Sequence, residues 1–239
     1  MKHYYITGTS RGIGRAMAEC LLKDEKNRVT GISRSNSISH KNFRHVKLDL
    51  SDVQSVKEFR FDQVEKADRI CLVNNSGEIG MVKPVGKLPA DEIIKNYNLN
   101  LVAPCLLMNE FMRTYQLIVA EKIVVNVSSG AGKNPVDGWG MYCASKAAVD
   151  MYSRVADLEE KVRSKKNFRV LAIAPGVVDT DMQAHIRSSA KEDFSRINDF
   201  VNYKKDNILA KPEAIAEKYI RLLDDLSNVN ETVIAIKDY

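Results

Sequence analysis

The feature that most constrains the fold is a regular alternation of short β-branched runs with longer helical patterns along all 239 residues. Seven runs are expected to be strands: His3–Thr7, Arg28–Ser33, His45–Leu48, Arg69–Asn74, Lys122–Val127, Arg169–Ala174 and Thr232–Ile236. Helices are expected near Ile13–Lys23, Val53–Phe61, Asp91–Tyr115, Tyr142–Arg163 and Glu213–Leu223. Several strand candidates are almost continuously apolar, as strands covered on both faces are. The pattern predicts a single α/β domain over residues 1–239, a doubly wound (Rossmann-type), mostly parallel seven-stranded sheet with helices on both faces.

Composition narrows the classes of function. The formal net charge is +5, and no basic block suggests a nucleic-acid partner. No apolar run reaches the ~18–20 residues of a membrane helix, and the N-terminus does not read as a signal peptide. The four cysteines have no paired spacing for zinc or a disulfide framework. We therefore expect a cytoplasmic protein with no metal, no membrane contact and no nucleic-acid partner.

One expected helix has a long apolar stripe. After Tyr142, apolar residues recur at alternating spacings of four and three: Ala144, Ala148, Met151, Val155, Leu158 and Val162. A second helix around Leu101–Tyr115 is apolar over much of its circumference. Core packing explains both helices, but two such helices also suit a subunit interface. The sequence thus leaves both explanations open, and we expect a homodimer or homotetramer.

A glycine loop follows the first expected strand. Gly8, Gly12 and Gly14 stand between an apolar strand and an apolar helix, in a G-x-x-x-G-x-G spacing. Glycines there let the backbone turn tightly and let a pyrophosphate approach the free N–H groups of the helix N-terminus. Three glycines alone are weak evidence, but their place after the first strand of an α/β pattern strengthens it. The loop predicts a dinucleotide site.

The residue after the second strand bears on which dinucleotide binds. An NAD site usually has an acid there, which holds the ribose 2′-hydroxyl. This chain has Arg34 instead, and Arg11 adds a second positive charge in the glycine loop. Guanidinium groups suit a 2′-phosphate, which favours NADP(H) over NAD(H). The alternative is two surface arginines without a ligand.

Tyr142 and Lys146 form the candidate catalytic pair. They are four residues apart, so their side chains project from one face of the expected helix. Tyrosine ionises near ~10, and a neighbouring ammonium would lower its pKa. Ser129, at the end of a strand, is placed to hydrogen-bond a substrate oxygen. A tyrosine-lysine pair alone is common, so the prediction depends on all these features occurring together.

Several short motifs follow one another along the chain in the same order as in one known enzyme family. They are Thr7–Gly14, Asn74-Asn75-Ser76-Gly77, Asn100, Ser128-Ser129, Tyr142 with Lys146, and Pro175–Thr180. By these motifs the chain resembles the short-chain dehydrogenase/reductase family over essentially its full length. Together with Arg34 and Arg11, the resemblance implies an NADPH-dependent carbonyl reductase that transfers hydride to a small-molecule ketone, and a narrower resemblance described below favours an α-diketone.

The resemblance also implies a role for each matched residue. Tyr142 would protonate the carbonyl oxygen, and Ser129 would orient that oxygen. Lys146 would bind the nicotinamide ribose and lower the pKa of Tyr142. Asn100 would hold a water of the proton relay through its helix backbone, and Asp49 would contact adenine. The expected catalytic set is Asn100, Ser129, Tyr142 and Lys146, and the expected substrate-binding set is Ser129, Trp139 and Tyr142.

Two further segments would complete the cofactor site by the same resemblance. Asn75–Gly77 would line the adenosine ribose, and Pro175–Thr180 would cover the nicotinamide and its carboxamide. Ser76 stands where the family usually has alanine, a small change. The expected cofactor-binding residues are Gly8, Thr9, Ser10, Arg11, Gly12, Ile13, Gly14, Ser33, Arg34, Asp49, Leu50, Asn75, Ser76, Gly77, Tyr142, Lys146, Pro175, Gly176, Val177, Val178 and Thr180.

A narrower resemblance concerns the stretch Ser128–Lys146. It is similar to the sepiapterin reductase branch, and especially to bacterial benzil reductases that form (S)-benzoin. Pterin-reducing members have an acid near the chain end, where this chain has Ala235, which favours a benzil-like aromatic diketone over a pterin. A sepiapterin or pterin reductase remains an alternative. A non-catalytic NADP(H)-sensing protein is another, although a sensor would not need all four catalytic residues.

The segment 182–211 interrupts the sheet pattern and is expected to form a lid over the substrate. Its apolar residues include Ile186, Phe194 and Phe200, and Trp139 is expected to wall an aromatic pocket. The alternative for this segment is an ordinary pair of surface helices. Arg187, Lys191 and Glu192 would oppose an apolar pocket if they faced inwards.

Overall fold

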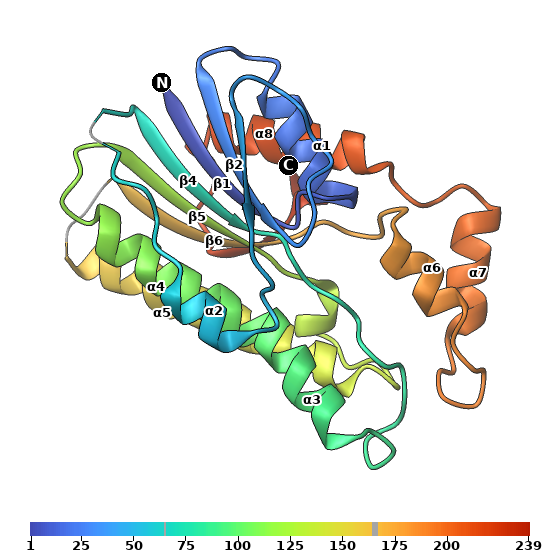
Figure 1. Ribbon diagram of the computed structural model, residues 1–239. Coiled ribbons are helices and arrows are strands. Elements are labelled where there is room, and N and C mark those ends of the chain that lie inside the picture. Colours follow the sequence, from blue (N-terminus) through green and yellow to red (C-terminus); the bar gives the residue numbers. More distant parts are fainter. Residues whose placement is uncertain (65, 164–166) are drawn as a thin grey trace.

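The computed structural model describes residues 1–64, 66–163 and 167–239. Seven parallel strands form one sheet in the order β3-β2-β1-β4-β5-β6-β7 (Figure 1). The strands are β1 (Lys2–Thr7), β2 (Asn27–Ser33), β3 (Phe43–Lys47), β4 (Arg69–Asn74), β5 (Glu121–Val127), β6 (Phe168–Ala174) and β7 (Val233–Ala235). The expected doubly wound sheet is confirmed, and it is entirely parallel rather than mostly so. Because the order reverses between β1 and β4, a crevice opens at the carboxyl ends of these strands.

The helices are α1 (Gly12–Leu21), α2 (Val53–Glu58), α3 (Ala90–Tyr97), α4 (Ala103–Tyr115), α5 (Gly140–Val162), α6 (Asp181–Arg187), α7 (Ile197–Lys205) and α8 (Pro212–Asp224). The five expected helices are present to within a few residues, the one expected over Asp91–Tyr115 being split in two, and α6 and α7 are additional. The single helix expected over Asp91–Tyr115 is divided by a π-helical turn at Asn98–Val102. A π turn inserts an extra residue into the helical register and is often found at functional sites.

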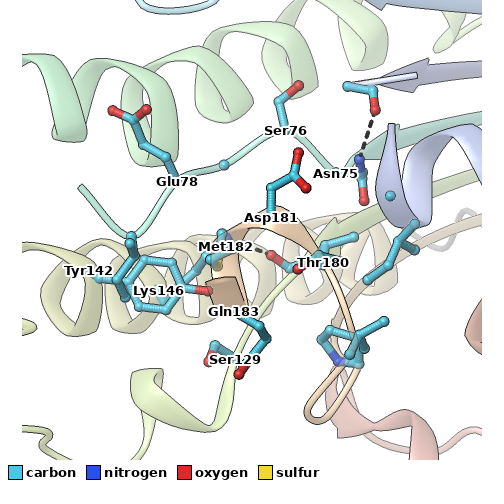
Figure 2. A pocket seen from close by; sticks show the side chains of 18 of the residues that line it. Asn75, Ser76, Glu78, Ser129, Tyr142, Lys146, Thr180, Asp181, Met182 and Gln183 are labelled. Carbon is cyan, nitrogen blue, oxygen red and sulfur yellow. Dashed lines mark hydrogen bonds between the residues drawn. The ribbon is translucent and has the colours of Figure 1, made fainter. Parts of the chain in front are cut away.

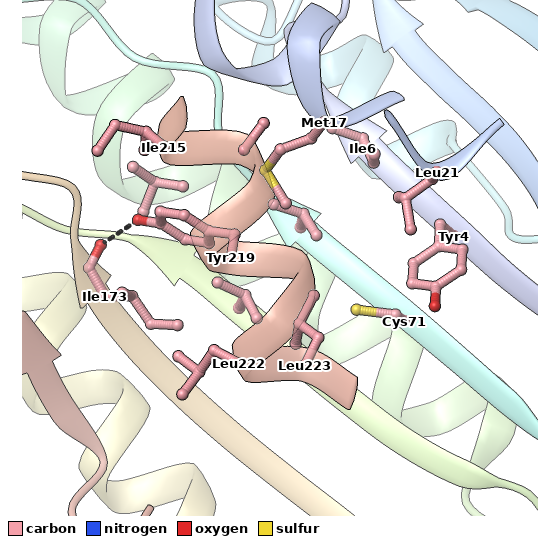
Figure 3. Close-up of a cluster of buried hydrophobic side chains, with 14 of the residues drawn as sticks. Tyr4, Ile6, Met17, Leu21, Cys71, Ile173, Ile215, Tyr219, Leu222 and Leu223 are labelled. Carbon is pink, nitrogen blue, oxygen red and sulfur yellow. Dashed lines mark hydrogen bonds between the residues drawn. The ribbon is translucent and has the colours of Figure 1, made fainter. Parts of the chain in front are cut away.

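Helices cover both faces of the sheet. Figure 1 shows α1 and α8 on one face and α2, α4 and α5 on the other. On the first face, Tyr219 of α8 lies in a fully buried apolar cluster with Met17 and Leu223 (Figure 3). Its hydroxyl donates a 2.8 Å hydrogen bond to the Ile173 carbonyl oxygen of β6, so the one polar atom of this large side chain is satisfied. This packing fixes α8 against the strands that carry the site.

The apolar stripe on α5 does not pack into the core. Met151, Val155, Leu158 and Val162 are exposed, and the last two are 61% and 75% accessible. Small or polar residues of the same helix, such as Ser153 and Ala156, are buried against the sheet instead. The core explanation is therefore wrong for this stripe. For the helix over Leu101–Tyr115 it is right, because α4 buries five residues in the core: Ala103, Leu107, Met108, Phe111 and Tyr115.

The segment after β6 contains two helices, α6 and α7, which lie beyond the carboxyl end of the sheet and apart from its two helical layers (Figure 1). Lys191 and Glu192, between these helices, are exposed, whereas Phe194 is completely buried. None of the helices in the described part of the chain is long and apolar enough to cross a bilayer.

Candidate active site

A large cleft lies at the carboxyl ends of the central strands, with a volume of about 820 Å³. The glycine loop after β1, Asn75 after β4, Ser129 after β5 and Pro175 after β6 all line it. Figure 2 shows Tyr142 and Lys146 with Ser129 on one side of this cleft, and Thr180 and Asp181 on the segment that crosses it. Parallel strands with helices on both faces bring their loops together at this edge, so residues distant in sequence meet here.

The glycine loop has the geometry of an anion cradle. Gly8 and Gly12 have φ values of +75° and +60°, which a side chain would strain. A Cβ on Gly14 would lie 2.5 Å from the Gly8 carbonyl oxygen and 2.4 Å from Asn75 Nδ2, so the loop closes tightly on the start of α1. The first turn of α1 holds no acidic residue that would repel a phosphate. These residues therefore suit the pyrophosphate of a dinucleotide.

The two arginines expected at the 2′-phosphate differ in their surroundings. Arg34 is exposed at the cleft, and its charge helps to lower the pKa of the Asp49 carboxyl, after the larger effect of a hydrogen bond from the Ser51 backbone. Arg11 instead pairs with Asp181 at the start of α6, at 2.7 Å between Nη1 and Oδ2. Because both partners are exposed, this ion pair is weak and a phosphate could compete for Arg11. Arg34 is thus the better placed of the two.

The side chains of Tyr142 and Lys146 are buried together on the first turns of α5. The Lys146 ammonium lies 5.6 Å from the centre of the Tyr142 ring and donates a 2.7 Å hydrogen bond to the Val127 carbonyl oxygen. Burial raises the pKa of Tyr142 to about 12, and a hydrogen bond with Ser129 opposes this shift. Burial lowers the pKa of Lys146 to about 8, while Asp150 acts in the opposite direction. In the protein without cofactor, desolvation therefore outweighs the expected lowering of the Tyr142 pKa by Lys146.

Asn100 lies behind the cleft, in the π turn. Asn100 is 1% exposed, and its side-chain amide makes two hydrogen bonds with the backbone of Glu78. Its Oδ1 accepts from the Glu78 N–H at 3.0 Å, and its Nδ2 donates to the Glu78 carbonyl oxygen at 2.8 Å. The residue four positions later is Pro104, which has no N–H to give to the Asn100 carbonyl oxygen in an α-helical register. The backbone oxygen of Asn100 thus lacks the hydrogen bond that an ordinary helix would supply.

Comparison with known proteins decides the family. A family model described as short chain dehydrogenase matches residues 2–191. The chain belongs to the short-chain dehydrogenases. It is therefore an oxidoreductase of the class that uses a nicotinamide dinucleotide, and the expected family is confirmed.

Individual short-chain dehydrogenases are similar over nearly the whole chain. A benzil reductase ((S)-benzoin forming) of Bacillus cereus is 38% identical over 244 residues, covering 94% of each protein. The sepiapterin reductase of Mus musculus is 31% identical, covering 91% of this chain and 90% of that protein. A short-chain dehydrogenase/reductase structure from Saccharomyces cerevisiae superposes with a TM-score of 0.83 at 26% identity, covering 100% of this chain and 97% of that one. The similarity to both reductase groups expected from Ser128–Lys146 is confirmed.

Most residues expected at this short-chain dehydrogenase site line the cleft, but Thr9, Gly14 and Asn100 do not. They are buried beneath its surface, where Thr9 lies 3.4 Å from Ser33, oxygen to oxygen, and Gly14 allows the tight loop. Three other lining residues, Glu78, Ile79 and Val136, were not named as site residues from the sequence, whereas Met182, Gln183 and Arg196 line the cleft from within the expected lid segment. Glu78 directly follows the matched Asn-Asn-Ser-Gly motif and Met182 closely follows Thr180, so both motifs could have been extended.

An aromatic cluster that includes Phe200 of α7 forms one wall of the cleft. Trp139 is stacked on Phe194, with ring centroids 5.4 Å apart, and packs against Phe200 at the same distance. It also meets the Tyr142 ring edge-on at 6.0 Å. Trp139 and Phe200 line the cleft, whereas Phe194 lies behind them. The wall is therefore apolar next to the buried tyrosine.

Proposed function

We propose that this protein is an NADPH-dependent carbonyl reductase that acts on small ketones or α-diketones, with a benzil-like aromatic diketone favoured. The observation that carries the proposal is the buried Tyr142 side chain, whose pKa Ser129 helps to lower, beside an apolar aromatic wall. The similarity to a benzil reductase supports it. NADP(H), held by the glycine loop, Arg34 and Pro175–Thr180, would supply the hydride.

The residues of the chain would handle the carbonyl oxygen and its proton. Ser129 donates a hydrogen bond to this oxygen and orients the carbonyl carbon toward the cofactor side of the cleft. Tyr142 gives its phenolic proton to the oxygen as negative charge develops there. Its raised pKa, about 12, keeps it protonated at neutral pH and therefore ready to act as an acid. Lys146, within the same buried pocket, holds a ribose hydroxyl and favours the phenolate that remains.

The walls of the cleft bear on the substrate class. An aromatic diketone gains affinity by burying apolar area against Trp139 and Phe200, at ~25 cal/mol per Å². A pterin instead needs polar partners for its amines, and an unpaired buried amine costs ~1–3 kcal/mol. Ala235, which lines the cleft near the chain end, offers no such side chain. These features disfavour a pterin, and a sepiapterin reductase is the second candidate because such a reductase is 31% identical to this chain.

Competition between substrates tests the proposal. With NADPH present, we expect benzil to be reduced with a higher kcat/KM than sepiapterin or an aliphatic ketone, measured from the loss of NADPH absorbance. Faster reduction of sepiapterin would overturn the substrate class and leave the reductase assignment intact. If no carbonyl is turned over while NADPH still binds, the protein is instead a sensor of the cofactor.

We also propose that residues 182–211 form the substrate lid of a single domain. This segment closes over the cleft through the aromatic cluster and through polar contacts with the body of the protein. Asp193, which is buried, pairs with Lys83 at 3.1 Å, and Lys204 pairs with Asp179 at 2.6 Å. Contacts of this kind hold α6 and α7 in place but can be broken when substrate enters.

The lowered pKa of Lys146 leads to a pH dependence. The ammonium is present below about pH 8, where it carries the charge and donors that a ribose and phosphate need, and is lost above it. We therefore expect the affinity for NADPH to fall as the pH rises through about 8, measured by cofactor fluorescence. The fall should persist in Tyr142→Phe and vanish in Lys146→Met. Loss of the fall in Tyr142→Phe would assign the titration to the tyrosine.

The exposed stripe on α5 leads us to propose a homodimer in which α5 meets its copy. Aspartate at both Val155 and Leu158 should separate the subunits, because each exposed apolar side chain is worth about 1.5–3 kcal/mol when buried. Together they should weaken the dimer more than about a hundredfold, measured by sedimentation velocity. Ile208→Asp, an exposed apolar residue outside α5, is the control. A parent protein that sediments as a monomer would contradict the proposal.

A further inference from the structure

Asn96, on the last turn of α3, lies next to Asn100 and is as deeply buried, at 1% exposure. Its Oδ1 accepts a 2.9 Å hydrogen bond from Asn100 Nδ2, and its own Nδ2 donates to the Glu78 carbonyl oxygen at 3.3 Å. A Cβ on Gly80 would lie 2.5 Å from Asn96 Nδ2, so the loop packs directly on this amide. Two buried amides thus converge on one backbone carbonyl, and both have their partners.

The position of this pair in the helix matters. The bond between Asn96 and Asn100 crosses the point where α3 gives way to the π turn Asn98–Val102. At a π turn the regular backbone ladder is interrupted, and here Pro104 removes one N–H as well. Fewer backbone bonds therefore hold the Asn100 peptide, and a side-chain bond can take their place.

We propose that Asn96 is a positioning residue of the active site, which acts through Asn100. It fixes the backbone carbonyl of Asn100, and the Glu78 loop beside it, where the proton relay behind Tyr142 and Lys146 needs them. Asn96 lies outside the cleft lining and touches no substrate. The inference rests on the proposed reductase function, because it assigns Asn96 to the supply of protons to Tyr142.

Three variants separate positioning from general stability. Asn96→Leu keeps the size of the side chain and removes both hydrogen bonds. Asn96→Asp keeps an oxygen that can accept from Asn100 Nδ2. Asn98→Leu is the matched control, because it alters the same π turn at a side chain that bonds to the Ser51 carbonyl oxygen instead.

For Asn96→Leu we expect kcat to fall about ten- to a hundredfold, as displacement of a catalytic group by about 1 Å can do. The affinity for NADPH should stay close to that of the parent, and the solvent deuterium isotope effect on kcat should rise because proton supply becomes limiting. Asn96→Asp should lie between parent and Asn96→Leu. Asn98→Leu should keep the parent kcat and isotope effect.

Amide hydrogen exchange gives a second measurement that does not need activity. Exchange over residues 76–80 and 98–102 should be faster in Asn96→Leu than in Asn98→Leu. Unchanged exchange, or an equal loss of kcat in both variants, would overturn the inference. If the parent reduces no carbonyl, the proposed function fails, and the exchange comparison still decides whether Asn96 positions Asn100. If Asn96→Leu does not fold, Asn96→Asp provides the comparison. A folded Asn96→Asp with both kcat and exchange like those of the parent would overturn the inference that Asn96 positions Asn100.

Discussion

Replacing Tyr142 by phenylalanine is expected to lower kcat by about 10²- to 10⁴-fold, the usual contribution of a positioned general acid. The change removes one oxygen and leaves the ring that packs against Trp139 at 6.0 Å. NADPH affinity should remain close to that of the parent, because Lys146 and the glycine loop are untouched. Steady-state rates on benzil together with cofactor fluorescence would measure both quantities.

The thermal stability of Tyr142→Phe should change little, because the ring that packs in the aromatic wall is kept and a single hydrogen bond contributes only about 0.5–1.5 kcal/mol. Tyr203→Phe is a matched control, because Tyr203 also lines the cleft but belongs to α7. This control should keep most of its activity. If Tyr142→Phe retained most of its activity as well, the proton would come from another group.

Changing Arg34 to aspartate is expected to reduce or reverse the preference for NADPH over NADH. A charge-assisted hydrogen bond is worth about 1.5–3 kcal/mol, which corresponds to about ten- to a hundredfold in affinity. The new carboxylate would repel a 2′-phosphate and accept from a 2′-hydroxyl instead. Dissociation constants for both cofactors, measured at one salt concentration, give the ratio directly.

Arg15→Asp is the control for this charge change. Arg15 is exposed on α1, pairs with Glu19 at 2.8 Å and does not line the cleft. Arg15→Asp changes the net charge by the same amount as Arg34→Asp, so any long-range effect of charge on the anionic cofactor should appear in both variants. Equal affinity of the parent for NADPH and NADH would contradict the assignment of NADP(H) altogether.

The sequence by itself determined the sheet and most of the site. Strand patterns such as Arg69–Asn74 are local, because a short, nearly continuous apolar run alternating with helical patterns is typical of a strand covered on both faces of a parallel sheet. The glycine loop and the Tyr142–Lys146 pair are also local, since their spacing decides the turn and the shared helix face. The family motifs then put Ser129 and Asn100 with them.

Only the tertiary structure decided which face each helix buries and which groups meet across the sheet. The stripe at Val155 and Leu158 has the same periodicity whether it faces a core or a second subunit, and the packing of α5 left it outside. Arg11 has the same charge wherever it lies, but the path of the chain placed Asp181 beside it. The bonds from Asn96 and Asn100 to Glu78 likewise span some twenty residues. Such contacts depend on how distant segments are brought together, which local spacing does not specify.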